Sequence, residues 1–394
     1  MNMTVMARYG EIFLKSDSVQ RHYIKIISKN IRNALLAQNL EHELEIHRGR
    51  ILINGNNPEY IAETVSKVFG IVSVSIAIRT ESSREEIENT AAEIASLKLK
   101  PGMSFAVRAR RSNVKGFTSQ ELGASTGDRI YDKVKDLKVD LKNPDYEIFV
   151  EARREGGLIY DSKIEGPGGL PLGTQGAVLS LMSAGIDSPV ASWLAMKRGC
   201  TASFVNFSGG RYMGGDILKA SLENLANLSK WTKGQPLKLY VMNIEPFYDA
   251  LMKVENPRNR CLICKRFMLR VASKTAKKYK YLGLVMGNNI GQVASQTLVN
   301  MAVVESVIPS DLPLIQPLIT YDKEETVVLA RKIGTFRDFA GDVSCSVVPK
   351  HPAVAATIEK VLEDEKNIDI ENLVEICSKD FVLYKALNGE IITD

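Results

Sequence analysis

The sequence predicts a multidomain protein in which α+β domains occupy the first 165 residues and an α/β domain follows. Three observations lead to this prediction. The length of 394 residues is enough for two or three domains. Short strand-like segments alternate with amphipathic helices up to residue 165. Beyond a linker rich in glycine and proline at 166–175, apolar runs alternate with helical segments, which is the pattern of a doubly wound parallel sheet covered by helices.

Residues 1–80 have the element order of a ferredoxin-like domain. A strand at Thr4–Tyr9 precedes a helix whose apolar residues, from Val19 to Leu35, recur at helical spacing. Two short strands, a second helix and a last strand follow at Leu44–His47, Ile51–Asn54, Pro58–Phe69 and Val72–Arg79. This β-α-β-β-α-β order is the ferredoxin-like arrangement.

Residues 81–165 form a second α+β block. Its predicted elements are a helix at Arg84–Leu97, a basic strand at Ser104–Arg111, a helix at Gln120–Val134, and strands at Glu147–Arg154 and Leu158–Ile164. Glycines 156 and 157 predict a hairpin between the last two strands. The basic strand and the loop after it carry Arg108, Arg110, Arg111 and Lys115, with no acidic residue between 101 and 120. Such a stretch either contacts phosphates or is an ordinary solvated surface.

In the C-terminal α/β domain, the loop Ser183–Ser188 is the first feature that indicates chemistry. It lies between an apolar strand at Ala177–Met182 and a helix that starts near Pro189, where the missing N–H of proline has no cost. Asp187 and Ser188 occupy positions suited to helix-capping oxygens. Because a strand–loop–helix unit directs free N–H groups and the positive helix end at one spot, the loop predicts a phosphate site.

The loop lacks the Gly-Lys-Ser/Thr sequence of the common NTPases. It resembles instead the pyrophosphate loop of the ATP-pyrophosphatase superfamily, Ser-Gly-Gly-x-Asp-Ser, with Ala184 in place of the first glycine. Enzymes of that superfamily split ATP between the α and β phosphates and adenylate a carbonyl or carboxyl oxygen. An alanine is compatible with the loop where its φ is negative.

Further motifs accompany this loop along the whole chain. They are Arg8–Ile12, Phe105–Arg111, Val139–Leu141, Gly168–Pro171, Met196–Gly199, Gly287, Gly291–Thr297, Pro317-Leu318 and Asp322-Lys323. Together they resemble the tRNA uracil 4-sulfurtransferase family, also called ThiI. The resemblance implies an N-terminal ferredoxin-like domain at residues 1–80, a THUMP RNA-binding domain at 81–165, a linker at 166–175, and a PP-loop ATP-pyrophosphatase catalytic domain at 176–394.

The resemblance implies an enzyme that binds ATP and Mg²⁺ and thiolates uridine 8 of tRNA. The uracil carbonyl oxygen is adenylated, and sulfur then displaces AMP to give 4-thiouridine. The implied ATP-binding residues are Leu181, Met182, Ser183, Gly185, Asp187, Ser188, Asn206, Phe207, Gly287, Gln296, and either Lys265 or Arg266. The implied catalytic residues are Asp187, toward Mg²⁺ or the substrate, and Lys323, toward phosphate. A plain lysine at a helix start is the alternative interpretation of Lys323.

Two of the five cysteines, Cys261 and Cys264, form a C-x-x-C pair. Zinc, an iron–sulfur centre and a redox pair all use this spacing. A closed zinc site is disfavoured, because the chain has four histidines, none of them near the pair, and no second C-x-x-C pair. Cys200 and Cys377 we interpret as small buried apolar residues.

Cys345, in the segment Asp342–Cys345, matches the catalytic cysteine of the resembled family. About fifty residues follow it, too few for the rhodanese domain of many bacterial members, so the chain resembles the archaeal-type branch. In that branch Cys261, Cys264 and Cys345 would hold a [4Fe–4S] cluster as metal ligands. A persulfide on Cys345, or a disulfide cycle between Cys264 and Cys345, is the alternative. The third interpretation is that these cysteines are structural and take no part in the chemistry.

The charge and hydropathy of the chain limit the classes of partner that are expected. The net charge of +5 is too small to establish nucleic-acid binding by itself, so the distribution of the charge matters more. The tRNA contacts are expected at Arg108, Arg110, Arg111 and Lys115. No apolar run long enough for a membrane span and no signal peptide appear, which predicts a cytoplasmic protein without a membrane partner.

Several functional alternatives stay open. The sulfur donor is sulfide or a persulfide carrier, a homodimer and a monomer are both compatible with the sequence, and sulfur supply to thiamine thiazole synthesis is a second role that the family suggests. A non-catalytic tRNA-binding protein, another PP-loop tRNA-thiolating enzyme and an amide-forming ligase are the competing classes. The segment Gly291–Thr297 argues against the ligase.

Overall fold

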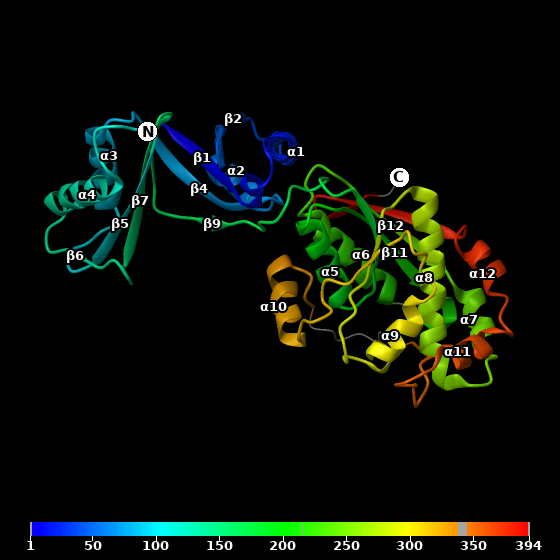
Figure 1. Cartoon of the computed structure of the whole chain (residues 1–394). Coiled ribbons are helices and arrows are strands. Elements are labelled where there is room, and N and C mark those ends of the chain that lie inside the picture. Colours follow the sequence, from blue (N-terminus) through cyan, green and yellow to red (C-terminus); the bar gives the residue numbers. More distant parts are fainter. Residues whose placement is uncertain (1, 215, 338–344, 393–394) are drawn as a thin grey trace. The chain divides into compact units, whose positions relative to one another are not determined.

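The computed structural model describes residues 2–214, 216–337 and 345–392 (Figure 1). It comprises two compact units. The N-terminal unit consists of Met1–Ile24 and Ala34–Gly168, and the C-terminal unit consists of Lys25–Asn33 and Gly169–Asp394. Within the described ranges, no helix is both long and apolar enough to cross a lipid bilayer.

Residues 2–80, which belong to the N-terminal unit except for Lys25–Asn33, have the predicted β-α-β-β-α-β order. Its elements are β1 (Met3–Tyr9), a short 3-10 helix (Glu11–Leu14), α1 (Asp17–Leu36), β2 (Glu43–His47), β3 (Arg50–Asn54), α2 (Pro58–Val65) and β4 (Ile71–Thr80). Strand β1 pairs antiparallel with both β3 and β4, and β2 pairs with β3. The ferredoxin-like prediction is confirmed, although α2 ends at Val65 rather than at Phe69.

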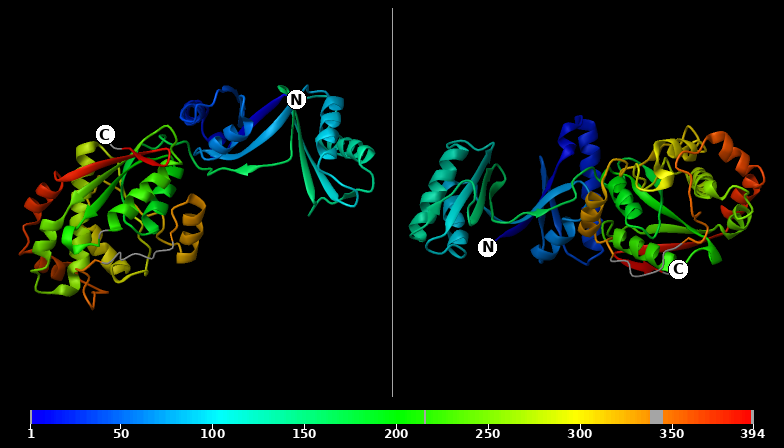
Figure 2. Two further views of the ribbon diagram at one scale, coloured as in Figure 1. Left: turned by 180° about the vertical axis from the view of Figure 1, so that it is seen from behind. Right: turned by 90° about the horizontal axis from the view of Figure 1, so that it is seen from below.

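The second half of the N-terminal unit carries two helices and five strands. They are α3 (Arg84–Ser96), β5 (Ser104–Ser112), α4 (Ser119–Lys133), β6 (Lys138–Val139), β7 (Tyr146–Arg153), β8 (Gly156–Tyr160) and β9 (Ile164–Glu165). Helices α3 and α4 lie together over β5, β7 and β8, where Ile87, Leu122 and Ile148 are buried in one apolar core (Figure 2). The strand expected at Leu158–Ile164 is divided into β8 and β9.

The two halves share one continuous sheet, in the order β2-β3-β1-β4-β8-β7-β5-β6, with β9 also on β4. The joint is the end of β4, where Arg79 and Thr80 pair with Leu158 and Gly157. A Cβ on Gly157 would lie 2.3 Å from the Thr80 hydroxyl oxygen and 2.5 Å from an Ile87 carbon. Only glycine therefore lets the β7–β8 hairpin lie flat against β4.

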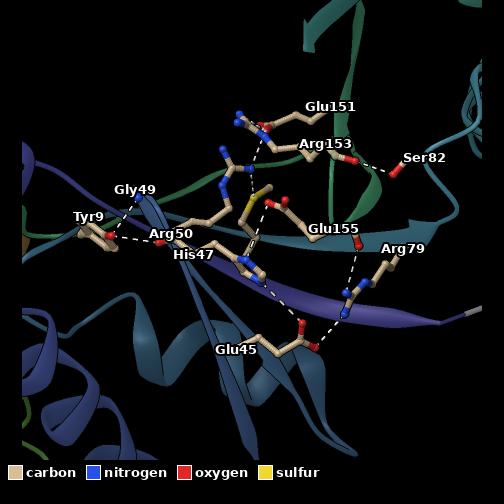
Figure 3. Close-up of polar contacts among 11 residues, drawn as sticks. Tyr9, Glu45, His47, Gly49, Arg50, Arg79, Ser82, Glu151, Arg153 and Glu155 are labelled. Carbon is tan, nitrogen blue, oxygen red and sulfur yellow. Dashed lines mark hydrogen bonds and ion pairs between the residues drawn. The ribbon is translucent and has the colours of Figure 1, made fainter. Parts of the chain in front are cut away.

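A cluster of buried charged side chains links the strands of the two halves near this joint (Figure 3). Glu151 of β7 is 1% exposed and accepts hydrogen bonds from Arg50 of β3 at 2.6 Å, Arg153 at 2.7–2.9 Å and the Tyr160 hydroxyl at 3.0 Å. Arg8 of β1 lies 3.9 Å away. Burial by itself would raise the pKa of Glu151, but Arg50 and Arg153 lower it to about 2.

The C-terminal unit contains the predicted doubly wound parallel sheet. Its parallel strands are β10 (Ala177–Leu181), β11 (Thr201–Ser208), β12 (Leu237–Asn243), β13 (Leu284–Val285) and β14 (Leu314–Ile315), in the order β14-β13-β10-β11-β12. The sheet continues beyond β12 with two antiparallel strands, β15 (Phe381–Leu387) and β16 (Glu390–Ile392), which the sequence analysis did not predict.

Helices cover both faces of this sheet (Figure 1). They are α5 (Asp187–Lys197), α6 (Asp216–Ser229), α7 (Glu245–Leu251), α8 (Arg260–Tyr279), α9 (Leu298–Glu305), α10 (Lys323–Ile333), α11 (Ile358–Glu365) and α12 (Ile370–Cys377). Helices α5 and α6 contact β11, and α8 contacts β10 and β13. The connections from β10 and from β12 run to opposite sides of β10, so the strand order reverses there. Ligands of open α/β sheets bind at such a reversal.

Candidate active site

A cavity of about 430 Å³ opens beyond the ends of β10 and β13. It is lined by Leu181, Met182, Ser183, Ala184, Gly185, Asp187, Ser188, Asn206, Phe207, Met213, Ile217, Lys265, Met268, Met286, Gly287, Asn288, Gln296 and Cys345. Every residue expected to bind ATP lines this cavity except Arg266. The Cys345 side chain, expected on the sulfur side of the reaction, lines it as well.

The loop Ser183–Ser188 is folded around two hydroxyl groups. Ser188 Oγ accepts a hydrogen bond from the Ser183 backbone N–H at 2.9 Å and lies 3.0 Å from Ser183 Oγ. The backbone N–H of Gly185 donates to Ser183 Oγ at 3.3 Å. The expected capping role of Asp187 and Ser188 is wrong, because the N-cap is Ile186 and no side chain caps the helix. The first turn of α5 therefore keeps free N–H groups, which suits it to an anion.

Ala184 does not disturb this loop. It has a negative φ, so the position makes no demand for glycine, and the residue is 4% exposed. Gly185 is not required by packing either, since a Cβ there would meet only Ser183 Oγ, at 3.6 Å. The space in front of Gly185 is therefore open toward the cavity.

Gly287, after β13, forms the opposite wall. A Cβ at this position would lie 2.7 Å from the carbonyl carbon of Asp187 and 2.9 Å from the backbone N of Ser188. A real Cβ does not approach backbone this closely, so only glycine lets β13 support the start of α5.

Asp187 and Lys323 face each other across the mouth of the loop. Lys323 Nζ lies 3.0 Å from Asp187 Oδ1 and 3.2 Å from Oδ2, and Gln292 Nε2 donates to Oδ2 at 3.1 Å. Lys323 is the first residue of α10, whose capping box is formed by Asp322 and Glu325. The ion pair links two helix starts, which a plain solvated lysine would not do.

The two basic candidates on α8 have different surroundings. Lys265 lines the cavity, and burial lowers its pKa while the nearby Cys261 and Cys264 raise it. Arg266 is 2% exposed and hydrogen-bonds to Glu365 at 2.7 Å and to the Val303 carbonyl at 2.6 Å. Arg266 is thus held in the protein core outside the cavity, and of the two candidates only Lys265 lines the cavity.

Amide side chains form the polar part of the cavity floor. Gln296 Nε2 donates to Asn288 Oδ1 at 3.2 Å, and Asn288 Nδ2 donates to Gln316 at 3.0 Å. Gln296 Oε1 is buried and has no hydrogen-bond partner among the described residues. Since a buried acceptor without a partner is costly, it marks a place for a ligand donor. Asn206 instead uses its amide nitrogen on the Met182 carbonyl, 2.9 Å away, and on Ser221.

Several wall residues carried no sequence signal. Met213, Ile217, Met268 and Met286 give the cavity an apolar side, and scattered methionines and isoleucines do not form a motif. Asn288 could have been found, because it directly follows the motif residue Gly287.

The three cysteines of interest gather beside the cavity. Cys261 and Cys264 lie on α8, and Cys345 forms an isolated β-bridge with Met213. Burial raises the pKa of Cys264 to about 12, and Cys345 and Cys261 add to that rise. Among residues 2–214, 216–337 and 345–392, no three His, Cys, Asp or Glu side chains are grouped closely enough to hold a metal ion. Asp342, in the motif before Cys345, lies outside the described residues.

The other two cysteines are buried as expected. Cys200 is 8% exposed and Cys377 is fully buried, and burial raises the pKa of both thiols. They are not among the residues that line the cavity.

The candidate tRNA contacts lie in the N-terminal unit, around a groove of about 750 Å³ between β5 and α4. Arg108 and Arg110 line it, and Arg108 pairs with Glu147 and donates to the Leu141 carbonyl at 2.8 Å. Arg110, Arg111 and Lys115 are exposed, and Arg111 donates to the Val114 carbonyl. Arg108 thus has its charge neutralised within the fold, whereas Arg110 and Lys115 present theirs to solvent.

Three family models match the chain. The model described as thiamine biosynthesis protein (ThiI) matches residues 173–370. The THUMP domain model matches residues 81–160, and the ThiI ferredoxin-like domain model matches residues 4–75. The three matches follow one another in the order of the three sequence blocks.

Named relatives are similar over almost the whole chain. A protein of Methanosarcina mazei named "Probable tRNA sulfurtransferase" is 38% identical over 376 residues, which cover 94% of this chain and 92% of the relative. Proteins of the same name from Methanocaldococcus jannaschii and Saccharolobus solfataricus are each 36% identical, cover 93% and 95% of this chain, and match 98% of their own lengths.

Two solved structures share the fold. A crystal structure of a 4-thiouridine synthetase–RNA complex with bound ATP superposes with a TM-score of 0.85 at 29% identity, covering 100% of both chains. The crystal structure of PH1313 from Pyrococcus horikoshii superposes with a TM-score of 0.64 at 27% identity, covering 84% of this chain and 99% of that one.

Proposed function

The chain belongs to the tRNA sulfurtransferase (ThiI) family, and from this premise we propose that it converts uridine 8 of tRNA to 4-thiouridine by adenylating the uracil O4 and replacing it with sulfur. As a tRNA sulfurtransferase, it carries out ATP-dependent tRNA thiolation. The observation that supports the finer proposal most is that the loop Ser183–Ser188 and the Cys345 side chain line the same cavity. Activation and sulfur transfer can then act on one bound base.

The chain binds the triphosphate through its backbone. The uncapped first turn of α5 and the N–H groups of the loop face the β and γ phosphates, and Gly185 leaves room for them. The apolar wall of Met268 and Met286 accepts the adenine ring, and the unpaired Gln296 Oε1 accepts a hydrogen bond from a ligand N–H or O–H. Lys265 adds a positive charge from α8.

Asp187 and Lys323 exchange partners when the nucleotide arrives. Mg²⁺ suits this position, because a single carboxylate beside a phosphate loop is its usual protein ligand in nucleotide sites. Asp187 would hold it, and the metal supplies charge neutralisation on the pyrophosphate. Lys323, released from the pair, turns its ammonium group to the phosphate oxygens and stabilises the charge that develops on the leaving group.

The activation step forms one bond and breaks another. The uracil O4 attacks the α-phosphorus, pyrophosphate leaves, and the N3 proton is lost. Hydrosulfide then attacks C4, AMP leaves with the former O4, and the proton of hydrosulfide ends on N3. No electron is transferred overall, so with sulfide as donor the chain needs no reductant. AMP is a far better leaving group than a carbonyl oxygen, which is why ATP is consumed.

Cys261, Cys264 and Cys345 fit a [4Fe–4S] cluster better than a single metal ion. Cys345 raises the pKa of both Cys261 and Cys264, so the three thiols are neighbours, and in the described part of the chain they are not grouped closely enough for one ion. A four-iron cluster is wider than a single ion and its cysteine ligands stand further apart. Held by these three cysteines, such a cluster would supply Lewis-acid chemistry toward sulfide. The chain's part is to supply these thiols and to keep water out.

A persulfide on Cys345 is the second candidate, favoured by the position of Cys345 in the cavity wall. Its terminal sulfur would attack C4 and expel AMP, and the Cys264 thiolate would then attack Cys345 Sγ. That releases the thiolated base, leaves a Cys264–Cys345 disulfide, and requires an external dithiol as reductant. Iron content separates the two candidates, because anaerobically purified protein should carry about four irons per chain in the first. Colourless protein that is fully active with sulfide contradicts the cluster.

The N-terminal unit binds the tRNA in this proposal, through Arg108, Arg110, Arg111 and Lys115. Folded RNA is recognised by its backbone and shape, for which exposed arginine and lysine are suited. Sulfur supply to thiamine thiazole synthesis and a cytoplasmic location accompany the proposal as family properties.

The test is nucleoside analysis of tRNA after anaerobic incubation with the full chain, ATP, Mg²⁺ and sulfide. We expect 4-thiouridine at position 8 and one AMP for each thiolated base, and neither product with Lys323→Gln. A 2-thiolated nucleoside would assign the chain to another PP-loop thiolation. Binding of tRNA without AMP release would identify a non-catalytic tRNA-binding protein.

A further inference from the structure

A buried tyrosine of the C-terminal unit touches the sulfur side of the cavity without lining the cavity itself. Tyr248, in α7, is 1% exposed, and its hydroxyl oxygen lies 3.5 Å from Cys264 Sγ. Cys345 also raises the pKa of Tyr248. One O–H group therefore lies close to two of the three thiols of the proposed sulfur site.

The ring of Tyr248 is fixed by close packing. A Cβ on Gly209 would lie 2.5 Å from Tyr248 Cε2, so the glycine lets the backbone after β11 lie directly on the ring. Phe247 and Tyr212 pack around it with ring centroids 5.9 and 5.6 Å away. A side chain enclosed in this way has one rotamer, and its hydroxyl cannot swing to another partner.

The choice of partner is unusual for a buried tyrosine. Buried Tyr hydroxyls usually find a hydrogen-bond partner. Among the described residues, the partner of the Tyr248 hydroxyl is a sulfur, Cys264 Sγ. Thiol sulfur is a weak acceptor, whereas a thiolate or a sulfide is a strong one, because an ionised acceptor strengthens a hydrogen bond about twofold. The contact becomes favourable when the sulfur is negative.

We propose that Tyr248 is a positioning residue for sulfur transfer, which donates its O–H to the sulfur at Cys264. The inference rests on the proposed function and adds a residue to its sulfur side. A phenol O–H is protonated at neutral pH, so the group is a donor. Its role is the same whether the sulfur belongs to a cysteine thiolate, a persulfide or a cluster.

Tyr212 provides a matched control. It belongs to the same aromatic cluster as Tyr248, and its hydroxyl donates to Asp249 at 2.7 Å rather than to sulfur. Tyr248→Phe and Tyr212→Phe both remove one hydroxyl and keep the ring. Only the first removes a donor to the sulfur site.

The experiment compares wild type, Tyr248→Phe and Tyr212→Phe in two separate steps. A pyrophosphate burst with ATP and tRNA, in the absence of sulfide, measures activation. Single-turnover formation of 4-thiouridine after sulfide is added measures sulfur transfer. We expect Tyr248→Phe to keep the burst and the KM for tRNA and to lose about tenfold in the sulfur-transfer rate, the value of one hydrogen bond. Tyr212→Phe should change neither step.

A second readout does not depend on turnover. Hydrogen bonds to the sulfurs of an iron–sulfur centre raise its reduction potential, so a redox titration of the reconstituted centre should give a lower potential in Tyr248→Phe. Equal sulfur-transfer rates and equal potentials in Tyr248→Phe and wild type would overturn the inference. So would a parallel loss of the burst, which would mean a general structural role. If the wild type makes no 4-thiouridine at all, the proposed function fails, and that result is seen before any variant is compared.

Discussion

The ammonium group of Lys323 lies 3.0 Å from Asp187 Oδ1, joining the first residue of α10 to the first residue of α5. Asp187 is partly shielded and Lys323 is half exposed. The two charges neutralise each other beside the loop Ser183–Ser188. Under the proposed function, Mg²⁺·ATP would give each charge a stronger partner, and the pair would separate to bind the nucleotide.

The first prediction concerns this pair. Lys323→Gln and Asp187→Asn should each slow the pyrophosphate burst by about a hundredfold, the cost of removing one electrostatic contact to a transition state. Thermal stability should change little, since a partly exposed ion pair contributes at most about 1 kcal/mol. Lys366→Gln, which removes an exposed lysine paired with Glu363, is the control and should leave the burst unchanged. A normal burst in Lys323→Gln would rule out a role in activation.

The second prediction separates two glycines of the cavity. Gly287→Ala places a Cβ 2.7 Å from the Asp187 carbonyl carbon, so it should destabilise the C-terminal unit by roughly 1–3 kcal/mol and weaken ATP binding as well. Gly185→Ala meets only Ser183 Oγ at 3.6 Å and should keep wild-type stability. Its ATP affinity should fall by about tenfold or more, because the methyl group occupies space meant for phosphate. Calorimetric titration with ATP and urea unfolding measure the two effects, and unaltered ATP affinity in Gly185→Ala would place the phosphates elsewhere.

The third prediction concerns acid stability. The folded-state pKa of Glu151, about 2, lies below its ordinary value of 4.5. Its carboxylate therefore stabilises the N-terminal unit above about pH 4.5, and this contribution disappears as the pH falls toward 2. Glu151→Gln should remove roughly 3 kcal/mol at pH 7, because Arg50 and Arg153 lose their buried counter-charge, and should flatten the acid dependence.

Two optical probes distinguish the units in that experiment. Both tryptophans of the chain, Trp193 and Trp231, belong to the C-terminal unit, where their rings pack edge to face with centroids 5.3 Å apart. Tryptophan fluorescence therefore follows the C-terminal unit alone, while far-UV circular dichroism follows both. Glu151→Gln should shift the dichroism transition and leave the fluorescence transition in place. A shift in fluorescence alone would contradict the assignment.

The fourth prediction tests the tRNA contacts. Arg110→Glu combined with Arg111→Glu should weaken tRNA binding and reduce the slope of log Kd against log salt by about two, since each phosphate contact contributes about one. ATP binding should be unaffected. Lys67→Glu is the control, because it removes a positive charge from the same unit. Lys67 lies in the turn after α2 and pairs with Glu63 on that helix. Equal tRNA affinity in all three proteins at physiological salt would remove β5 from the RNA surface.

The sequence predicted β10 well, because a strand covered by helices on both faces is apolar along its length, whereas the two-residue parallel strand β14 was not predicted. Strand β15 was missed for the opposite reason. It pairs with β12 on one side and with β16 on the other, but most of its side chains are not buried, and it follows an acidic stretch of the sequence. Its register with β12 is set by tertiary pairing, which local sequence does not encode.

The site residues were predictable where a sequence motif determines the backbone. They were not predictable where the direction of a side chain determines whether it reaches the cavity. Lys265 and Arg266 are adjacent on α8, so they point about 100° apart, and the rotation of the helix determines which one meets the cavity. That rotation comes from burial of Leu262 and Phe267 in the core. Tyr248 carried no signal at all, because its importance depends on α7 meeting α8 in space.

The shared sheet of the N-terminal unit limits how this protein can be divided. A fragment that ends after β4 would lose β8 and β9 from one strand edge, and the uncovered N–H and C=O groups would pair with whatever strand is nearest, including another copy. The ferredoxin-like part is therefore not expected to be stable as a separate fragment. Any shortening of this chain has to keep the strands β1 to β9 together, because they form one sheet.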